Sequence, residues 1–210
     1  MIIEFFGLPG SGKTTVAKLL VKQKNFTLVK VDSKRELFFY NCLFFIKHPF
    51  KFIKSFFYIL RASVSCQDFY YKFMNCFIVH NAKYQKAKKF PRAIIDQGYF
   101  QNFLSVFNEV KTENFFIDYL KNFIRPNFLV VLELSLDKRQ ERLAQRGYGV
   151  RENFSQLQVE IWQKASEKNY FLAKNILNKV GVSFEVFGSE ESPEQLAERI
   201  INKLENGAHQ

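Results

Sequence analysis

The chain has 210 residues, enough for one α/β domain with a complete hydrophobic core. Its formal net charge of +11 favours anionic ligands such as nucleotides, nucleic acid or anionic lipid. Cys42, Cys66 and Cys76 lack C-x-x-C spacing, which argues against a zinc site or a disulfide scaffold and favours reduced thiols.

The first segment is an apolar run at residues 1–6, which is typical of a buried strand. Residues 7–14 read Gly-Leu-Pro-Gly-Ser-Gly-Lys-Thr and match the phosphate-binding loop (P-loop) pattern G-x-x-x-x-G-K-[ST]. An amphipathic helix is predicted from Gly12 to Lys24, so strand, loop and helix follow in the order that the motif requires. Because the loop begins at residue 7, it leaves no room for a cleaved signal peptide, and we expect a cytoplasmic location.

The loop residues have the chemistry that binding a nucleoside triphosphate requires. Glycines let backbone N–H groups approach phosphate oxygens, and the helix that follows offers further unpaired N–H groups. Lys13 is long enough to reach the β- and γ-phosphates, and the Thr14 hydroxyl can ligate Mg²⁺. We expect the nucleotide to be bound by the loop and the start of the helix, at Gly7, Pro9, Gly10, Ser11, Gly12, Lys13, Thr14 and Thr15.

Strands and helices alternate along the rest of the chain. A second strand is predicted at 26–31 and a third at 92–96, with a long helical insert between them at 34–90. The remaining elements expected are helices at 98–109 and 114–124, a strand at 127–134, a basic helix at 135–146, a long helix at 155–179, a strand at 182–187 and a helix at 192–204 capped by Ser192.

Strands separated by helices indicate parallel pairing with right-handed crossovers. We therefore predict a three-layer α/β fold with a five-stranded parallel sheet, in a single domain over residues 1–210. Residues 34–90 should lie on the acceptor side, and residues 136–152 should form a lid. Ligands bind at the carboxyl ends of such strands, where the P-loop, Asp32 and Asp96 all occur.

Two carboxylates follow predicted strands. Asp96 can bind Mg²⁺ directly or through water, or it can accept a proton from an attacking hydroxyl. The alternative is that Asp96 caps the helix after Gly98. Asp32 can orient or deprotonate an acceptor hydroxyl, and it can equally cap the helix that follows.

Arginines gather in the predicted lid. Arg139, Arg142 and Arg146 have i, i+3, i+7 spacing and share one helical face, and Arg151 follows a Gly-Tyr-Gly turn. Clustered guanidinium groups suit a phosphoryl group in transfer, and a segment flanked by glycines suits a closing lid. The alternative is a solvated basic helix whose arginines pair with Glu141.

Together these segments resemble the P-loop nucleoside and nucleotide kinases, thymidylate kinase most closely. The resemblance rests on residues 7–15, on Ile-Ile-Asp-Gln-Gly-Tyr-Phe at 94–100 and on 128–146, and it leaves out residues 34–90. It implies Mg-ATP-dependent transfer to a small-molecule acceptor, with Thr14 and Asp96 at Mg²⁺ and Arg142 and Arg146 as lid charges. Arg142 is also expected to contact the nucleotide. It also implies adenine near Gly188-Ser189, and a homodimer, since similar proteins are often dimers.

One position departs from that family. In thymidylate kinase-like proteins an arginine that grips the acceptor usually follows the carboxylate, but here the residue is Gln97. Glutamine cannot neutralise a phosphate, which favours an acceptor without one, such as a sugar or other alcohol. The alternative is that Lys34 or Arg35 supplies the charge. Acceptor contacts are expected from Asp32, Gln97 and Arg151.

Residues 37–60 are rich in Phe and Lys. Lysines interrupt the segment and Pro49 splits it, so it is not a membrane span, and a new helix should begin at Pro49. In that helix Lys51, Lys54, Ser55 and Tyr58 form one polar stripe, and apolar residues cover the rest. The apolar side chains of this segment have three alternative roles: they pack against the kinase core, they contact a membrane surface, or they form a dimer surface or an apolar acceptor pocket.

The leading hypothesis is a small-molecule kinase that uses ATP and Mg²⁺. A second is a P-loop NTPase that acts as a regulatory switch at a membrane surface; the guanine signature Asn-Lys-x-Asp of a GTPase is absent from the sequence. A third is a binding module for nucleic acid or membrane that uses the positive charge. No nucleic-acid-binding motif occurs in the sequence, so we expect no nucleic-acid partner.

Overall fold

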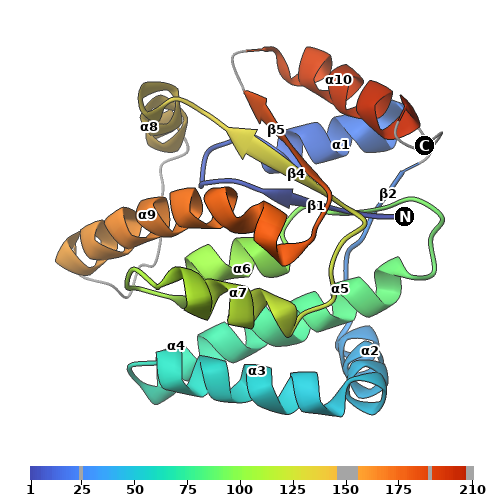
Figure 1. Ribbon diagram of the computed structural model, residues 1–210. Helices are drawn as coiled ribbons and strands as arrows, with labels where there is room; N and C mark the ends of the chain where they lie inside the picture. Colours follow the sequence, from blue (N-terminus) through green and yellow to red (C-terminus); the bar gives the residue numbers. More distant parts are fainter. Residues whose placement is uncertain (24–25, 146–155, 189–190, 207–210) are drawn as a thin grey trace.

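The computed structural model describes residues 1–23, 26–145, 156–188 and 191–206 (Figure 1). The five strands within these residues form one parallel sheet in the order β2-β3-β1-β4-β5. Their bounds are β1 (Ile2–Phe6), β2 (Thr27–Leu28), β3 (Ala93–Ile95), β4 (Phe128–Glu133) and β5 (Phe184–Gly188). The predicted three-layer α/β fold is confirmed.

Both faces of the sheet are covered by helices, as a parallel sheet requires. One face carries α1 (Lys13–Gln23) and α10 (Pro193–Asn206), and the other carries α6 (Tyr99–Val106), α7 (Glu113–Lys121) and α9 (Gln156–Val180) (Figure 1). Successive side chains of β1 alternate between the two resulting cores: Ile3 and Phe5 pack with α1 and α10, whereas Ile2 and Phe6 pack with the other helices.

Residues 34–87 are helical, as predicted. The segment comprises α2 (Lys34–Lys47), α3 (Pro49–Ala62), α4 (Cys66–Lys72), the π-helical stretch η1 (Phe73–Ile78) and α5 (Val79–Ala87). The helix α5 reaches the sheet beside β3, whereas α2 and α3 form the outermost layer, farthest from α1 and α10 (Figure 1). Aromatic rings hold the layers together; Phe52 of α3, for example, lies 5.0 Å from Phe77 of η1 between ring centroids.

Local signals placed several helix ends correctly. The helix α3 begins at Pro49, as predicted. The Ser192 Oγ accepts a hydrogen bond from the Gln195 N–H at 3.2 Å, and the Gln195 side chain accepts one from the Ser192 N–H at 3.0 Å. This capping box fixes the start of α10. The second strand is shorter than predicted because β2 pairs only with β3, which has three residues.

The orientation of α3 contradicts the sequence-based expectation of a separate polar stripe. Ser55 is buried and Lys51 is half-buried, with its Nζ 3.3 Å from the carbonyl oxygen of Phe123. Apolar side chains of the same helix are instead exposed, among them Phe50 and Phe57. Tertiary packing therefore decided which side of α3 meets the core. No helix among the described residues has the length and apolar character needed to cross a bilayer.

Candidate active site

The P-loop connects the end of β1 to the start of α1. Gly10 and Gly12 have φ values of +87° and +89°, a region in which side chains are strained, so the loop needs glycine at both positions. The buried Lys13 Nζ donates hydrogen bonds to the carbonyl oxygens of Gly7 at 2.6 Å and Leu8 at 3.0 Å. Its positive charge is thereby kept within the loop, beside the N-terminus of α1.

A second constraint holds the beginning of the loop. A Cβ on Gly7 would lie 2.6 Å from the carbonyl oxygen of Leu132 in β4, so no other residue fits without backbone movement. The Gly7 N–H donates to Gln101 Oε1 at 3.3 Å, which ties the loop to α6 on the other side. The loop is therefore positioned by elements far apart in the sequence before any ligand binds.

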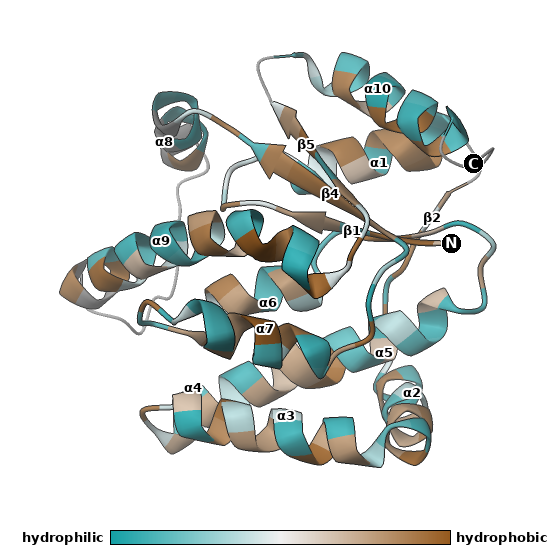
Figure 2. Ribbon diagram, in the orientation of Figure 1, coloured by the Kyte–Doolittle hydropathy of each residue, from teal (hydrophilic) through white to brown (hydrophobic). Residues whose placement is uncertain are grey.

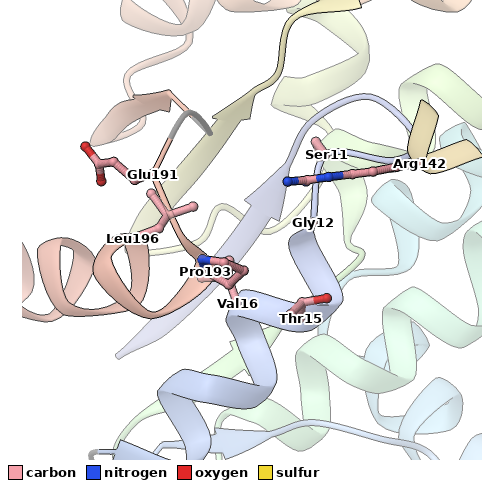
Figure 3. Close-up of a pocket in the computed structure, with 8 residues that line it drawn as sticks. All are labelled: Ser11, Gly12, Thr15, Val16, Arg142, Glu191, Pro193 and Leu196. Atoms are coloured by element: carbon pink, nitrogen blue, oxygen red, sulfur yellow. The ribbon is translucent and has the colours of Figure 1, made fainter. Parts of the chain in front are cut away.

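A pocket of about 240 Å³ lies beside the loop (Figure 3). The loop, α1, α8 (Leu136–Gln145) and the beginning of α10 all contribute to it. The lining residues are Ser11, Gly12, Thr15, Val16, Arg142, Glu191, Pro193 and Leu196. Four of the predicted nucleotide-binding residues, Ser11, Gly12, Thr15 and Arg142, thus meet at one cavity.

The arginines on the predicted face of α8 have different environments. Arg142 extends from α8 across the loop at Ser11 and Gly12, as Figure 3 shows. Arg139 is half-buried and its guanidinium lies 3.3 Å from Glu167 of α9, which makes it an anchor for α8. Arg146 and Arg151 lie outside the described residues, as does Ser189. Gly188, which was predicted to follow the last strand, is instead the final residue of β5.

Asp96 lies at the carboxyl end of β3, next to the strand that leads into the P-loop. Its Oδ1 is 3.2 Å from Lys83 Nζ of α5, and the exposed fractions of these side chains are 20% and 16%. Lys83 Nζ also lies 3.5 Å from the backbone carbonyl oxygen of Gln97. The pair is partly shielded from water but remains accessible to a ligand. Gln97 itself is exposed.

The alternative role of Asp96 as a helix cap is wrong. Gly98 is the N-cap of α6, and the side chain that accepts hydrogen bonds from the first turn is Glu4 of β1. The Glu4 carboxylate accepts from the N–H groups of Phe100 at 2.7 Å and Gln101 at 3.4 Å, and from the Tyr84 hydroxyl. Complete burial raises the pKa of Glu4 from 4.5 to about 7, against the opposing effect of these hydrogen bonds.

Asp32 also does not cap a helix, because Ser33 Oγ accepts the hydrogen bond from the Glu36 N–H at the start of α2. The Asp32 side chain is 73% exposed and lies 3.8 Å from Lys86 Nζ of α5. Lys86 bonds more closely to both carboxylate oxygens of Glu36, at 2.9 Å, and this hydrogen bond raises the pKa of Lys86. Two lysines of α5, Lys83 and Lys86, therefore lie beside the carboxylates of Asp96 and Asp32. Lys34 and Arg35 are exposed.

Three side chains of this site were not predicted. Lys83 and Lys86 lie in a lysine-rich stretch in which nothing distinguishes them from solvated residues. Glu4 carried a usable signal, because a lone carboxylate within an apolar strand must find hydrogen-bond partners when buried.

The residues present suit Mg²⁺ better than a metal held by protein ligands alone. No group of three or more His, Cys, Asp or Glu able to hold a metal occurs among the described residues. Mg²⁺ keeps several waters and binds through one or two carboxylates together with substrate phosphates. The half-buried Asp96 directly follows β3, and the exposed Thr14 is in the first turn of α1, which the P-loop connects to the neighbouring strand β1. These two side chains fit this scheme.

Comparisons with known proteins agree with this geometry. A family model described as "AAA domain" matches residues 3–163. A structure of deoxyadenosine kinase from M. mycoides, with the products dCMP and dCDP bound, is 19% identical; the match covers 98% of this chain and 100% of that one, with a TM-score of 0.60. A second structure of that enzyme, with dATP bound, has a TM-score of 0.56 at 19% identity and the same coverage.

Thymidylate kinase from Candida albicans is 12% identical, and the match covers 99% of this chain and 92% of that one, with a TM-score of 0.55. A search of curated protein sequences found no match. At these identities the solved structures establish the fold, and the family model establishes the family. The chain belongs to the AAA domain family and has the fold of the P-loop nucleoside and nucleotide kinases.

Proposed function

We propose that this protein is a cytoplasmic Mg-ATP-dependent kinase that transfers the γ-phosphate to a small-molecule acceptor. The observation that carries the proposal is the Asp96–Lys83 pair at the end of β3, beside the strand that leads into a complete P-loop. A P-loop alone would serve any NTPase. A half-buried carboxylate and lysine on the acceptor side provide, in addition, groups that can hold and activate a second substrate.

Each of the main residues has a role in this proposal. Lys13 neutralises the β- and γ-phosphates, and Thr14 and Asp96 hold hydrated Mg²⁺, which would supply charge neutralisation to the triphosphate. Asp96 is also the candidate base for an acceptor hydroxyl. Arg142 binds the nucleotide from α8, next to Gly12. Arg146 and Arg151 would supply further positive charge from the lid.

The ion pair between Lys83 and Asp96 changes which class of acceptor we propose. From Gln97 alone, an acceptor without a phosphate is favoured. Lys83 Nζ lies near both Asp96 and the backbone of Gln97, where it supplies a positive charge close to the position of the absent arginine. We therefore propose a phosphorylated acceptor, such as a nucleoside monophosphate or a sugar phosphate, whose phosphate is bound by Lys83.

The test is ADP release from Mg-ATP across nucleosides, nucleoside monophosphates, sugars and sugar phosphates. We expect release that depends on one phosphorylated class and falls at least about a hundredfold in Lys13→Ala with the fold intact. Acceptor-independent hydrolysis throughout the panel would favour an NTPase switch and contradict the kinase proposal.

Lys83→Met separates the acceptor class from the kinase activity itself. We expect KM for the phosphorylated acceptor to rise about tenfold to a hundredfold, with KM for ATP unchanged. The matched control is Lys89→Met, which removes an exposed lysine just beyond the same helix. A kinase that prefers an unphosphorylated acceptor, with the same KM in Lys83→Met, would contradict the phosphate assignment and leave the kinase assignment standing.

A further inference from the structure

The outward face of α3 is a continuous apolar stripe. Phe50, Ile53, Phe57 and Leu60 have exposed fractions of 85%, 46%, 48% and 46%. Their spacing of three, four and three residues places them on one side of the helix. We call these four residues the α3 stripe. The helix α2, which contacts α3, also exposes Phe38 and Ile46, each by 73%.

The α3 stripe is separate from the part of the helix that packs in the core. Ile59 and Ser55 are 2% and 1% exposed, and Phe52 packs on Phe77 of η1. Figure 2 shows apolar residues along α3 in the outermost layer of the molecule. Single exposed apolar residues are ordinary, but a stripe about three turns long indicates a surface that has a partner.

Charge distinguishes between the candidate partners. Lys54 and Arg61 of α3 are exposed, and each lies four residues after a residue of the stripe, so they flank it on the helix. Lys47, at the end of α2, is also exposed. Residues 37–67 contain no Asp or Glu. The nearest carboxylates in the sequence, Glu36 and Asp68, lie 2.9 Å and 2.8 Å from Lys86 and Lys72. The stripe is thus bordered by positive charge without nearby acidic residues in the same segment.

A second copy of the chain is a poor partner for this face. A two-fold interface brings the same patch together from both subunits, so the lysines and arginine of one copy would face those of the other. The headgroup region of an anionic bilayer accommodates both features, because acyl chains receive the apolar side chains while anionic headgroups attract the flanking cations. We propose that α3 binds peripherally to an anionic membrane surface through its stripe.

The position of α3 is compatible with nucleotide binding at the same time. The nucleotide pocket is lined by Thr15 and Val16 of α1 and by Pro193 and Leu196 of α10. Both helices lie across the sheet from α3 (Figure 1). A membrane on the α3 side therefore leaves the pocket accessible. This proposal does not depend on the chemistry of the acceptor.

The full chain is tested by flotation with vesicles of phosphatidylcholine, with and without phosphatidylglycerol. We expect binding only to vesicles that contain the anionic lipid, and weaker binding as salt is raised. Phe57→Ser should weaken binding about tenfold, since it removes an apolar ring from the lipid contact. Its matched control is Phe171→Ser on α9, where the phenylalanine is 46% exposed and lies outside the stripe.

A charge variant completes the experiment. Lys54→Gln combined with Arg61→Gln should weaken binding to anionic vesicles about tenfold or more, whereas Lys22→Gln on α1 should leave it unchanged. Melting curves and nucleotide binding check that each variant is folded. Absence of vesicle binding, or binding that Phe57→Ser does not weaken, would overturn the proposal. Sedimentation equilibrium shows whether the face joins two copies: a dimer that Phe57→Ser dissociates, without vesicle binding, would also overturn it.

Discussion

Glu4 and His80 are both buried ionisable groups, and burial moves their pKa values in opposite directions. Desolvation raises the pKa of Glu4 from 4.5 to about 7, and it lowers the pKa of His80 from 6.5 to about 3, with the charge of Lys83 adding to the effect on His80. Each shift favours the neutral form of the side chain. The two groups therefore contribute oppositely to the dependence of stability on pH.

The sign of each contribution follows from which state holds the proton. Between pH 4.5 and 7 the folded protein keeps a proton on Glu4 that the unfolded chain releases, so this contribution to stability is lost as the pH rises. Between pH 3 and 6.5 the unfolded chain binds a proton on His80 that the folded protein does not, so stability increases as the pH rises. From pH ~5 to pH ~8, linkage gives a change of about −2.5 kcal/mol for Glu4 and about +2 kcal/mol for His80.

Urea unfolding of the ligand-free protein at these two pH values tests the calculation. In the natural protein the two contributions nearly cancel. We expect the change in the free energy of unfolding from pH ~5 to pH ~8 to be about 2.5 kcal/mol more positive in Glu4→Gln than in the natural protein. The same change should be about 2 kcal/mol more negative in His80→Phe than in the natural protein, because each variant lacks one of the two opposing contributions. Burial also lowers the pKa of His48. His48 and the other titratable groups should contribute equally in all three proteins, so their contributions cancel in the comparison. A Glu4→Gln protein with the natural pH dependence would refute the reasoning.

Three further predictions concern single side chains. Ser192→Ala removes the hydroxyl that accepts from the Gln195 N–H, and it should lower the free energy of unfolding by about 1 kcal/mol in urea titrations; no change would contradict the importance of the cap. Gly12→Ala places a Cβ on backbone at φ +89°, so we expect calorimetry to show much weaker ATP binding, and normal affinity would argue against a rigid loop. Arg142→Ala should raise KM for ATP about tenfold while the melting temperature stays constant, and an unchanged KM would remove Arg142 from the nucleotide site.

Features that depend on contiguous residues could be predicted from the sequence. The P-loop, the order of strands and helices, the start of α3 at Pro49 and the cap at Ser192 each depend on residues close together in the chain. Parallel pairing followed from the alternation of strands and helices, because such a chain must cross over between neighbouring strands. The family assignment rests on the same contiguous motifs and on the match over residues 3–163.

Other features depend on which segments meet, and only the tertiary structure decided them. Glu4 is bonded to Phe100, 96 positions away, so its role at the start of α6 has no local signature. Lys83 became a candidate acceptor ligand only because α5 packs beside β3, which brings it to Asp96. In α3 the periodicity predicted a helix with polar and apolar sides, but the packing of η1 beneath it determined which side was covered. Hydrophobic periodicity specifies a secondary structure; the burial of its faces depends on the elements that compete to cover them.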